Sequence, residues 1–284
     1  MVNPDARLAG HLGLSSPATP LLMHSARSAG SLDQIDALAD HGFAGVQDLF
    51  LKLRAPVERA AMAERMATRG LALASFGGDP MHWNTPLWSS DDRNALDESV
   101  AASVQVARDF GGAGAVCVAG IDPDRGVSAQ IAAMADNLNR VAEQAAEARL
   151  TLLVEPIAPQ RIAGMLLDRL DAAEEVVRRV DRPSVRLMFD IGHIAIMGHD
   201  VAKALAGCRD IIGLVQATDI SKHERVTPEH GTLNWLEIGD ALTHIGYKGL
   251  IELEFEPRAS NAADEAAMLD SVATTVGKWR RPLC

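Results

Sequence analysis

Short runs of apolar residues alternate along the chain with longer stretches in which apolar residues recur every three or four positions. The short runs are rich in Leu, Val, Ile and Phe and predict eight strands, at residues 8–14, 45–50, 71–76, 114–120, 150–155, 185–190, 211–216 and 249–254. The longer stretches are Ala-rich and amphipathic and predict helices, for example over LDQIDALADHG (32–42) and LDAAEEVVRRV (170–180). We therefore expect strands and helices to alternate along the whole chain.

This alternation predicts a closed (β/α)8 barrel. Strands separated by helices form parallel β-α-β units, and their strands are buried on both faces and nearly continuously apolar. No Gly-x-Gly-x-x-Gly motif follows the first strand, which disfavours an open dinucleotide-binding sheet. The chain has 284 residues and no linker or low-complexity segment, so we predict a single TIM-barrel domain over residues 1–284.

Four consecutive predicted strands end in a residue with a side-chain oxygen: Glu155, Asp190, Gln216 and Glu254. In a barrel of this type the carboxyl ends of the strands meet at one rim, where the active site lies. Asp190 alone is explained equally well as a helix cap. Three carboxylates together, however, repel one another unless a cation lies among them, and oxygen donors without cysteine suit Mg²⁺ or Mn²⁺. We therefore predict one divalent metal site here, with His193 over it.

Several stretches between about Leu150 and Arg258 are typical of one family. They are LLVEP, MFDIGH, LVQATD followed by KHE, and IGYKGLIELEFEPR. The last is the most specific, because an Ile-Gly-Tyr turn, a strand and a Glu-x-x-Pro ending occur together. On these stretches the chain resembles the hydroxypyruvate isomerase group of the xylose isomerase-like barrels, which also include ketose 3-epimerases and endonuclease IV. The N-terminal half matches only loosely.

The resemblance implies a chemistry for the strand-end residues. In that group the equivalents of Glu155, Asp190, Gln216 and Glu254 hold one divalent cation, and the two glutamates are the catalytic pair that transfers a proton. The resemblance also makes His193 a substrate contact. The implied activity is isomerisation, through an enediol, of a small hydroxy-keto acid or sugar of the hydroxypyruvate or 2-oxo-tetronate type.

The chain departs from that family at three places. The family has a glutamate at the position of Gln47, a histidine at Cys117, and Gly-Glu-Ile-Asn where this chain reads Gly-Thr-Leu-Asn at 231–234. The loop KHERVTPEHG (222–231) is also longer. We expect these positions to line or border the substrate pocket, so they leave the predicted metal site intact and the substrate open. Cys117 itself is better explained as a small core residue than as a nucleophile.

Two further features are candidates for substrate binding. Lys222, His223 and Arg161 are cationic and suit a substrate carboxylate, and for each an exposed loop charge is an equally good interpretation. The long loop 77–92 carries Trp83 and Trp88 and either covers the pocket or packs on the barrel.

Other functions remain compatible with the sequence. They are a metal-dependent ketose 3-epimerase, a dehydratase or lyase on the same metal site, and a non-catalytic barrel that binds a small acid or sugar. Glutamine rather than histidine at 216 favours the hydroxypyruvate isomerases over the epimerases. A nuclease is disfavoured, because that branch needs more histidine ligands and a positive groove.

Composition restricts the partners and the compartment. The formal net charge of −11 and the lack of a basic cluster argue against nucleic acid, which leaves a small molecule as the expected partner. No apolar stretch is long enough to span a membrane, and the N-terminus lacks a signal-peptide core. Cys117, Cys208 and Cys284 form neither a metal motif nor a disulfide framework, which favours the reducing cytoplasm. A homo-oligomer is compatible with the sequence, which leaves the number of subunits open.

Overall fold

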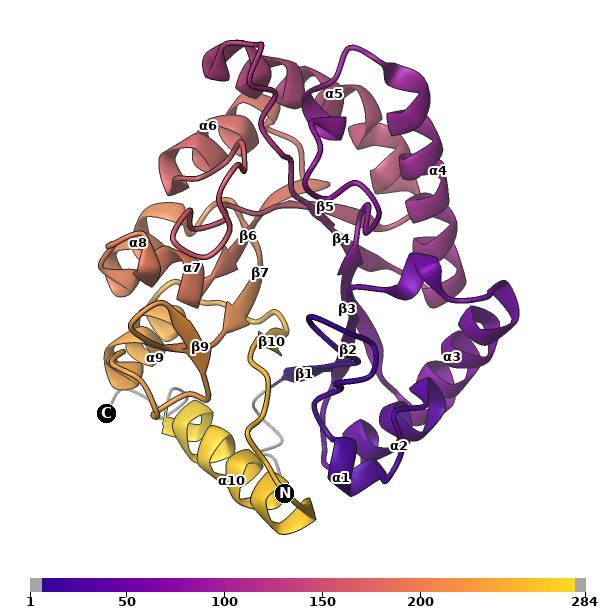
Figure 1. The fold of residues 1–284 in the computed structure, drawn as a ribbon, viewed down its shortest axis with the longest axis vertical. Coiled ribbons are helices and arrows are strands. Elements are labelled where there is room, and N and C mark those ends of the chain that lie inside the picture. Colours follow the sequence, from indigo (N-terminus) through magenta and orange to yellow (C-terminus); the bar gives the residue numbers. More distant parts are fainter. Residues whose placement is uncertain (1–6, 279–284) are drawn as a thin grey trace.

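The computed structural model describes residues 7–278, which form a parallel barrel surrounded by helices (Figure 1). The barrel strands are β1 (Leu8–His11), β2 (Gly45–Asp48), β3 (Ala72–Gly77), β4 (Ala113–Cys117), β5 (Leu150–Val154), β6 (Val185–Asp190), β7 (Ile212–Ala217) and β10 (Ile251–Leu253). They close in the order β1-β10-β7-β6-β5-β4-β3-β2. The predicted eight-stranded parallel barrel is therefore confirmed, whereas the extent of the domain over residues 1–284 stays a prediction.

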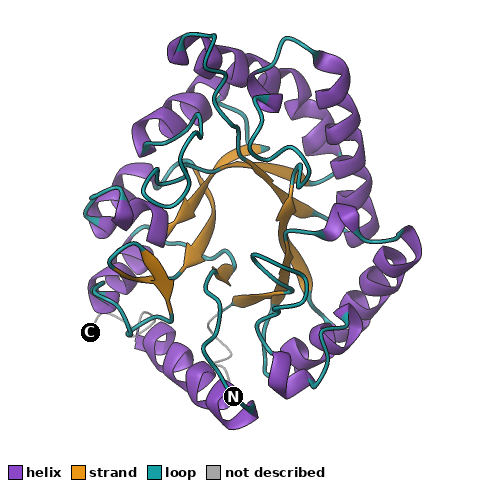
Figure 2. Ribbon diagram, in the orientation of Figure 1, coloured by secondary structure: helices purple, strands orange, loops and turns teal. Residues whose placement is uncertain are grey.

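The helices lie outside the ring of strands (Figure 2). They are α1 (Met23–Ala26), α2 (Ser31–Asp40), α3 (Pro56–Arg69), α4 (Arg93–Phe110), α5 (Val127–Glu147), α6 (Leu170–Val180), α7 (Ile191–Ile196), α8 (Val201–Cys208), α9 (Trp235–His244) and α10 (Ala262–Lys278), with 3-10 turns η1 (Leu51–Leu53) and η2 (Leu87–Ser89). The predicted helix over 170–180 has the same bounds in the structure. No helix within residues 7–278 is long and apolar enough to cross a membrane.

Several elements differ from the predicted bounds; the fourth strand, for example, ends at Cys117 rather than at residue 120. The first strand ends at His11 rather than at residue 14, because Gly13 has a φ of +126°, and a Cβ there would lie 2.1 Å from the Ser16 carbonyl oxygen. An antiparallel hairpin, β8 (Asp219–Ser221) and β9 (Glu224–Val226), stands where only a loop was expected. Its turn contains Lys222, whose φ is +59°, and His223 instead of the Asn-Gly pair that identifies a tight hairpin in a sequence.

The strands separate two apolar cores. Val116, Leu153, Met188 and Leu214 form a cluster with one member from each of four neighbouring strands, β4 to β7, and these inward-facing residues fill the barrel. Their neighbours in sequence, such as Cys117, belong to a much larger cluster between the strands and the helices. Alternate residues of each strand therefore point to the barrel axis.

Candidate metal centre and active site

The four predicted strand-end residues continue the inward-facing rows of their strands. Glu155 and Asp190 come two residues after the inward-facing Leu153 and Met188, and Gln216 comes two residues after Leu214. Glu155 and Glu254 are each the first residue after their strand rather than its last residue. All four are buried, and the structure brings them together at the carboxyl end of the barrel.

Asp190 uses its two carboxylate oxygens differently. Oδ1 accepts a hydrogen bond from the backbone N–H of His193 at 3.0 Å and so caps α7, as the simpler prediction had it. Oδ2 lies 2.5 Å from the Arg225 guanidinium. Burial alone would raise the pKa of Asp190, but Arg225 and the N-terminal N–H groups of α7 hold it below its ordinary value. The cap thus uses one oxygen, and the other faces the site, where Arg225 contacts it.

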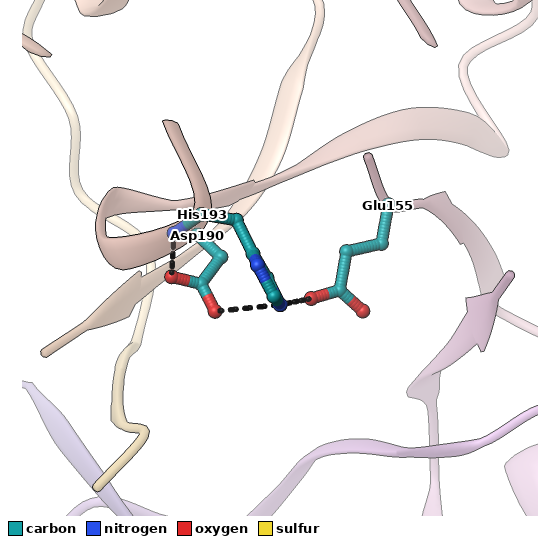
Figure 3. Close-up of side chains that lie close together, drawn as sticks. All are labelled: Glu155, Asp190 and His193. Atoms are coloured by element: carbon teal, nitrogen blue, oxygen red, sulfur yellow. Dashed lines mark hydrogen bonds and ion pairs between the residues drawn. The ribbon is translucent and has the colours of Figure 1, made fainter. Parts of the chain in front are cut away.

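His193 lies between Asp190 and Glu155, with Nε2 at 3.9 Å and 4.0 Å from their carboxylates (Figure 3). Its Nδ1 accepts a hydrogen bond from the backbone N–H of Ala158 at 3.2 Å. Burial lowers the pKa of His193 to about 4, so the ring is neutral at pH 7 and its one hydrogen belongs on Nε2. His193 therefore presents an N–H donor to the site, which suits a substrate contact better than a metal ligand.

Glu254 has hydrogen-bond donors on both oxygens. Oε1 accepts from Arg225 at 2.9 Å, and Oε2 accepts from the amides of Gln47 at 2.7 Å and Gln216 at 3.3 Å. Burial raises the pKa of Glu254 in spite of these donors. Gln47 thus contacts the candidate site, as we expected of this departure from the family. Its amide donates a hydrogen bond to Glu254 at the position where the family has a glutamate, which would bring a further acidic group.

Glu155 lies at the other side of His193. Burial, together with the nearby negative charges of Asp190 and Glu254, raises its pKa well above the ordinary value. A carboxyl group with a raised pKa takes up and returns a proton more readily near neutral pH.

The sequence reasoning missed Arg225, which the hairpin carries into the carboxylate cluster. Its guanidinium lies against Asp190, Glu254 and His193. Because His193 Nε2 bears a hydrogen, its 3.1 Å contact with Arg225 Nη2 brings two donors together. The only signal in the sequence was an arginine within a long polar loop.

Glu252 was also missed, although its position two residues before Glu254 predicts that it faces inward. It lies deeper in the barrel and accepts a hydrogen bond from the amide of Gln216 at 3.0 Å. Burial raises its pKa to about 8. The amide of Gln216 thus bridges two glutamates, and its Oε1 atom is buried with no hydrogen-bond partner among the described residues.

The donor set fits a hard divalent cation. One carboxylate oxygen each of Glu155 and Asp190 lie within 4.8 Å of each other, with a ring nitrogen of His193 at the same range. Gln216 adds a buried carbonyl oxygen that lacks a partner. Three carboxyl groups, Glu155, Asp190 and Glu254, are buried at the rim, and Arg225 supplies only one positive charge, so the negative charge that remains favours a cation. Oxygen ligands of this kind are those that Mg²⁺ and Mn²⁺ prefer.

A cavity of about 590 Å³ opens beside these residues and reaches the surface. Glu155, His193, Arg225 and Glu254 line it, and so does Arg161. Arg161 donates to the His223 carbonyl oxygen at 2.8 Å and lies 3.3 Å from Glu224. Lys222 and His223 are exposed at the hairpin turn and are not among the residues that line this cavity. Their role in binding a substrate carboxylate stays a prediction.

The loop 77–92 both packs on the barrel and borders the cavity. Trp88 is buried, and its carbonyl oxygen accepts a hydrogen bond from Asn137 at 3.1 Å, whereas Trp83 is 40% exposed and lines the cavity.

Cys117 faces the outer core, where burial raises the pKa of its thiol. Its neighbours Val116 and Val118 line the cavity in its place. Cys117 and Cys208 are free and buried, and Cys284 lies outside the described residues.

The chain is similar to known proteins in sequence and in fold. The chain is 30% identical over 239 residues to a 2-oxo-tetronate isomerase of Cupriavidus necator, which covers 82% of this chain and 89% of that protein. It is 26% identical over 167 residues to the hydroxypyruvate isomerase of Escherichia coli, which covers 58% of this chain and 64% of that protein.

Solved structures and a family model agree with the barrel. The structure of an AP endonuclease, family 2, from Brucella melitensis matches with a TM-score of 0.74 and 22% identity over 84% of this chain and 92% of that chain, which shows a shared fold. A family model described as a xylose isomerase-like TIM barrel matches residues 35–272. The resemblance inferred from the sequence motifs is therefore confirmed, and the chain belongs to the family of xylose isomerase-like TIM barrels.

Proposed function

We propose that the protein is an isomerase that acts on a small hydroxy-keto acid or sugar through an enediol and depends on one divalent metal ion. The observation that carries the proposal is that two buried glutamates, Glu155 and Glu254, line one cavity together with a neutral histidine and a partly buried arginine. The names of the similar proteins, 2-oxo-tetronate isomerase and hydroxypyruvate isomerase, support the same reaction class.

The two glutamates would form the proton-transfer pair. Isomerisation moves a proton between adjacent carbons, so one carboxylate removes it and another group returns it. Burial raises the pKa of both side chains, which suits groups that exchange a proton at neutral pH. The N–H groups of His193 and Arg225 would orient the substrate oxygens, and Arg161 at the rim would attract a negatively charged substrate.

The metal would be held by Glu155, Asp190, Gln216 and Glu254. A divalent cation bound there supplies Lewis-acid stabilisation of the negative charge that develops on the enediol oxygens. Mg²⁺ and Mn²⁺ both suit these oxygen donors. We place the enzyme in the reducing cytoplasm, because Cys117 and Cys208 are free thiols.

Proton exchange tests the reaction directly. The protein with Mn²⁺ is incubated in D₂O with hydroxypyruvate, 2-oxo-tetronates and ketoses, and deuterium uptake next to the carbonyl is followed by NMR. We expect exchange with at least one compound, and a loss of about 10²–10⁴-fold in Glu155→Gln and Glu254→Gln at saturating Mn²⁺, because the amide cannot act as a base. Glu237→Gln, on the exposed face of α9, is the control. Absence of exchange across the panel would refute the isomerase, and release of water would favour a lyase.

Metal binding is tested separately with Asp190→Asn. The amide keeps the shape of the side chain but removes the charge that faces the site, so we expect calorimetry to show a large loss of Mn²⁺ affinity. Asp210→Asn removes an exposed carboxylate that pairs with Arg178 and should bind Mn²⁺ like the wild type. Wild-type Mn²⁺ affinity in Asp190→Asn would contradict the assignment of this side chain as a ligand.

A further inference from the structure

The two sides of the cavity differ in chemistry. The residues that follow β5, β6 and β10 and the hairpin bring the charged side chains to one side, where Ile157 and Ile162 are the apolar exceptions. The opposite side is lined by apolar side chains from β4 and from the loops after β1, β2, β3 and β4, which we call the apolar wall: Leu14, Leu49, Phe50, Trp83, Val116 and Val118. In the view down the barrel, β3 and β4 lie across the ring from β6 and β7 (Figure 1).

The apolar wall exposes hydrocarbon to the cavity. Leu14, Leu49, Phe50 and Val118 are only half-buried, and Trp83 is 40% exposed. An apolar surface in a concave site beside convergent polar groups is typical of a pocket that binds a partly apolar ligand.

The wall offers few polar partners. Two polar residues lie at its edge, Ser15 and Asp79. Ser15 is hydrogen-bonded to Glu256, and Asp79 Oδ1 accepts from the backbone N–H of His82 at 3.0 Å. A hydroxyl group that is placed against the hydrocarbon of the wall, away from these two residues, would lose its water without gaining a hydrogen bond, which is unfavourable.

The cavity is also larger than the small acids that the relatives' names suggest. At a share of at most about 30 Å³ for each non-hydrogen atom, a 2-oxo-tetronate with about nine such atoms fills less than half of the space. The volume of about 590 Å³ lies in the range of pockets that enclose much larger ligands. With such an acid placed among the charged residues, the space left over includes that beside the apolar wall.

We propose that the substrate is a hydroxy-keto compound with an apolar substituent, such as an aryl or branched alkyl group, rather than a short polyol acid. The hydroxy-keto end lies among Glu155, His193, Arg225 and Glu254, and the substituent lies against the apolar wall. This inference rests on the proposed isomerase function, because it takes the charged side as the reacting end.

Binding of a matched pair of probes tests the inference. Hydroxamates imitate the planar oxygens of an enediol, so 3-phenylpropanohydroxamate is compared with a trihydroxybutanohydroxamate by calorimetry on the Mn²⁺-loaded protein. We expect the phenyl compound to bind at least about tenfold more tightly, since burying even part of the ring contributes that much. Trp83→Ala and the isosteric Val118→Thr should each reduce this preference. Val57→Thr, at a site on α3 that is 78% exposed, is the matched control and should keep it.

Each other outcome has a distinct meaning. If the polyol hydroxamate binds as tightly as the phenyl compound, or if both wall variants keep the full preference, the apolar substituent is wrong while the proposed function stands. If neither hydroxamate binds in the presence of Mn²⁺, the enediol site itself is wrong, and the inference falls with the proposed function.

Discussion

At the scale of single residues, Arg225 determines the charge balance of the site. Its guanidinium is the only arginine or lysine group that contacts Asp190 and Glu254 among the ion pairs of the described residues. A buried carboxylate without a partner is strongly unfavourable, so Arg225 stabilises the rim when no metal is bound. A divalent cation and Arg225 therefore compete for the same carboxylate oxygens.

Replacing Arg225 tests this competition. In Arg225→Ala we expect the free energy of unfolding in EDTA to fall by about 3–5 kcal/mol, because two buried carboxylates lose their partner. Added Mn²⁺ should restore more stability in the variant than it adds to the wild type. Both are measured by urea unfolding. The control is Arg178→Ala, which removes a half-exposed surface pair with Asp210 and should cost less than about 1 kcal/mol. Equal stability of the two variants in EDTA would contradict the role of Arg225.

At the scale of elements, Asp219 holds the β8–β9 hairpin in place. Its Oδ1 accepts from the backbone N–H groups of Ile220 at 2.8 Å and Leu233 at 3.0 Å. Its Oδ2 accepts from Glu229 N at 3.1 Å and from the indole N–H of Trp235 at 2.8 Å. One buried carboxylate thus joins the hairpin, the following loop and the first turn of α9, and it fixes the element that carries Arg225.

Asp219→Asn should loosen this element while the barrel stays folded. An amide replaces an acceptor oxygen with a donor, so at least one of the four bonded N–H groups loses its partner, at a cost of about 1–3 kcal/mol. We expect faster tryptic cleavage in the hairpin, which contains the exposed Lys222, and tighter Mn²⁺ binding, because the displaced Arg225 no longer competes for the carboxylate oxygens. Asp240→Asn, on the exposed side of α9, is the control. Unchanged cleavage rates in Asp219→Asn would contradict the role of Asp219 in holding the hairpin in place.

At the scale of the whole molecule, the barrel closes between its first and last strands over a short seam. β1 and β10 pair only at Leu8 with Ile251 and at Ala9 with Glu252. His11 extends this seam, because its Nε2 donates to the carbonyl oxygen of Phe255 at 3.0 Å and its Nδ1 accepts from Gly13 N at 3.2 Å. Burial lowers the pKa of His11 to about 4, so the ring is neutral in the folded protein.

We therefore expect acid to lower the stability of the folded protein through His11 at this seam. The unfolded chain binds a proton on His11 near pH 6.5 and the folded chain only near pH 4, so the stability from this group is complete above pH 6.5 and falls by about 3 kcal/mol as the pH drops to 4. We expect denaturant unfolding of His11→Asn to depend less steeply on pH in this window, with His193 accounting for part of the remaining dependence. The exposed His199→Asn should keep the wild-type slope. A wild-type slope in His11→Asn would contradict the prediction.

Much of the architecture follows from local patterns in the sequence. The apolar runs and the three-to-four-residue spacing predict the strands and helices, because burial on both faces of a parallel strand and on one face of a helix leaves distinct periods. Glu155, Asp190 and Gln216 could be placed at one rim from strand order and alternation alone, since a period of two sends these positions inward. The carboxylate cluster was thus predictable before any contact was known.

The tertiary structure alone decided what lies among those carboxylates and what faces them across the cavity. Arg225 comes from a hairpin whose turn has no local signature, and it reaches Asp190 only because Asp219 anchors that hairpin to α9. The tautomer of His193 depends on the backbone of Ala158, and the apolar wall gathers residues from four separate segments of the chain. Such contacts join positions far apart in sequence, and no period or spacing records them, because only closure of the barrel brings them together.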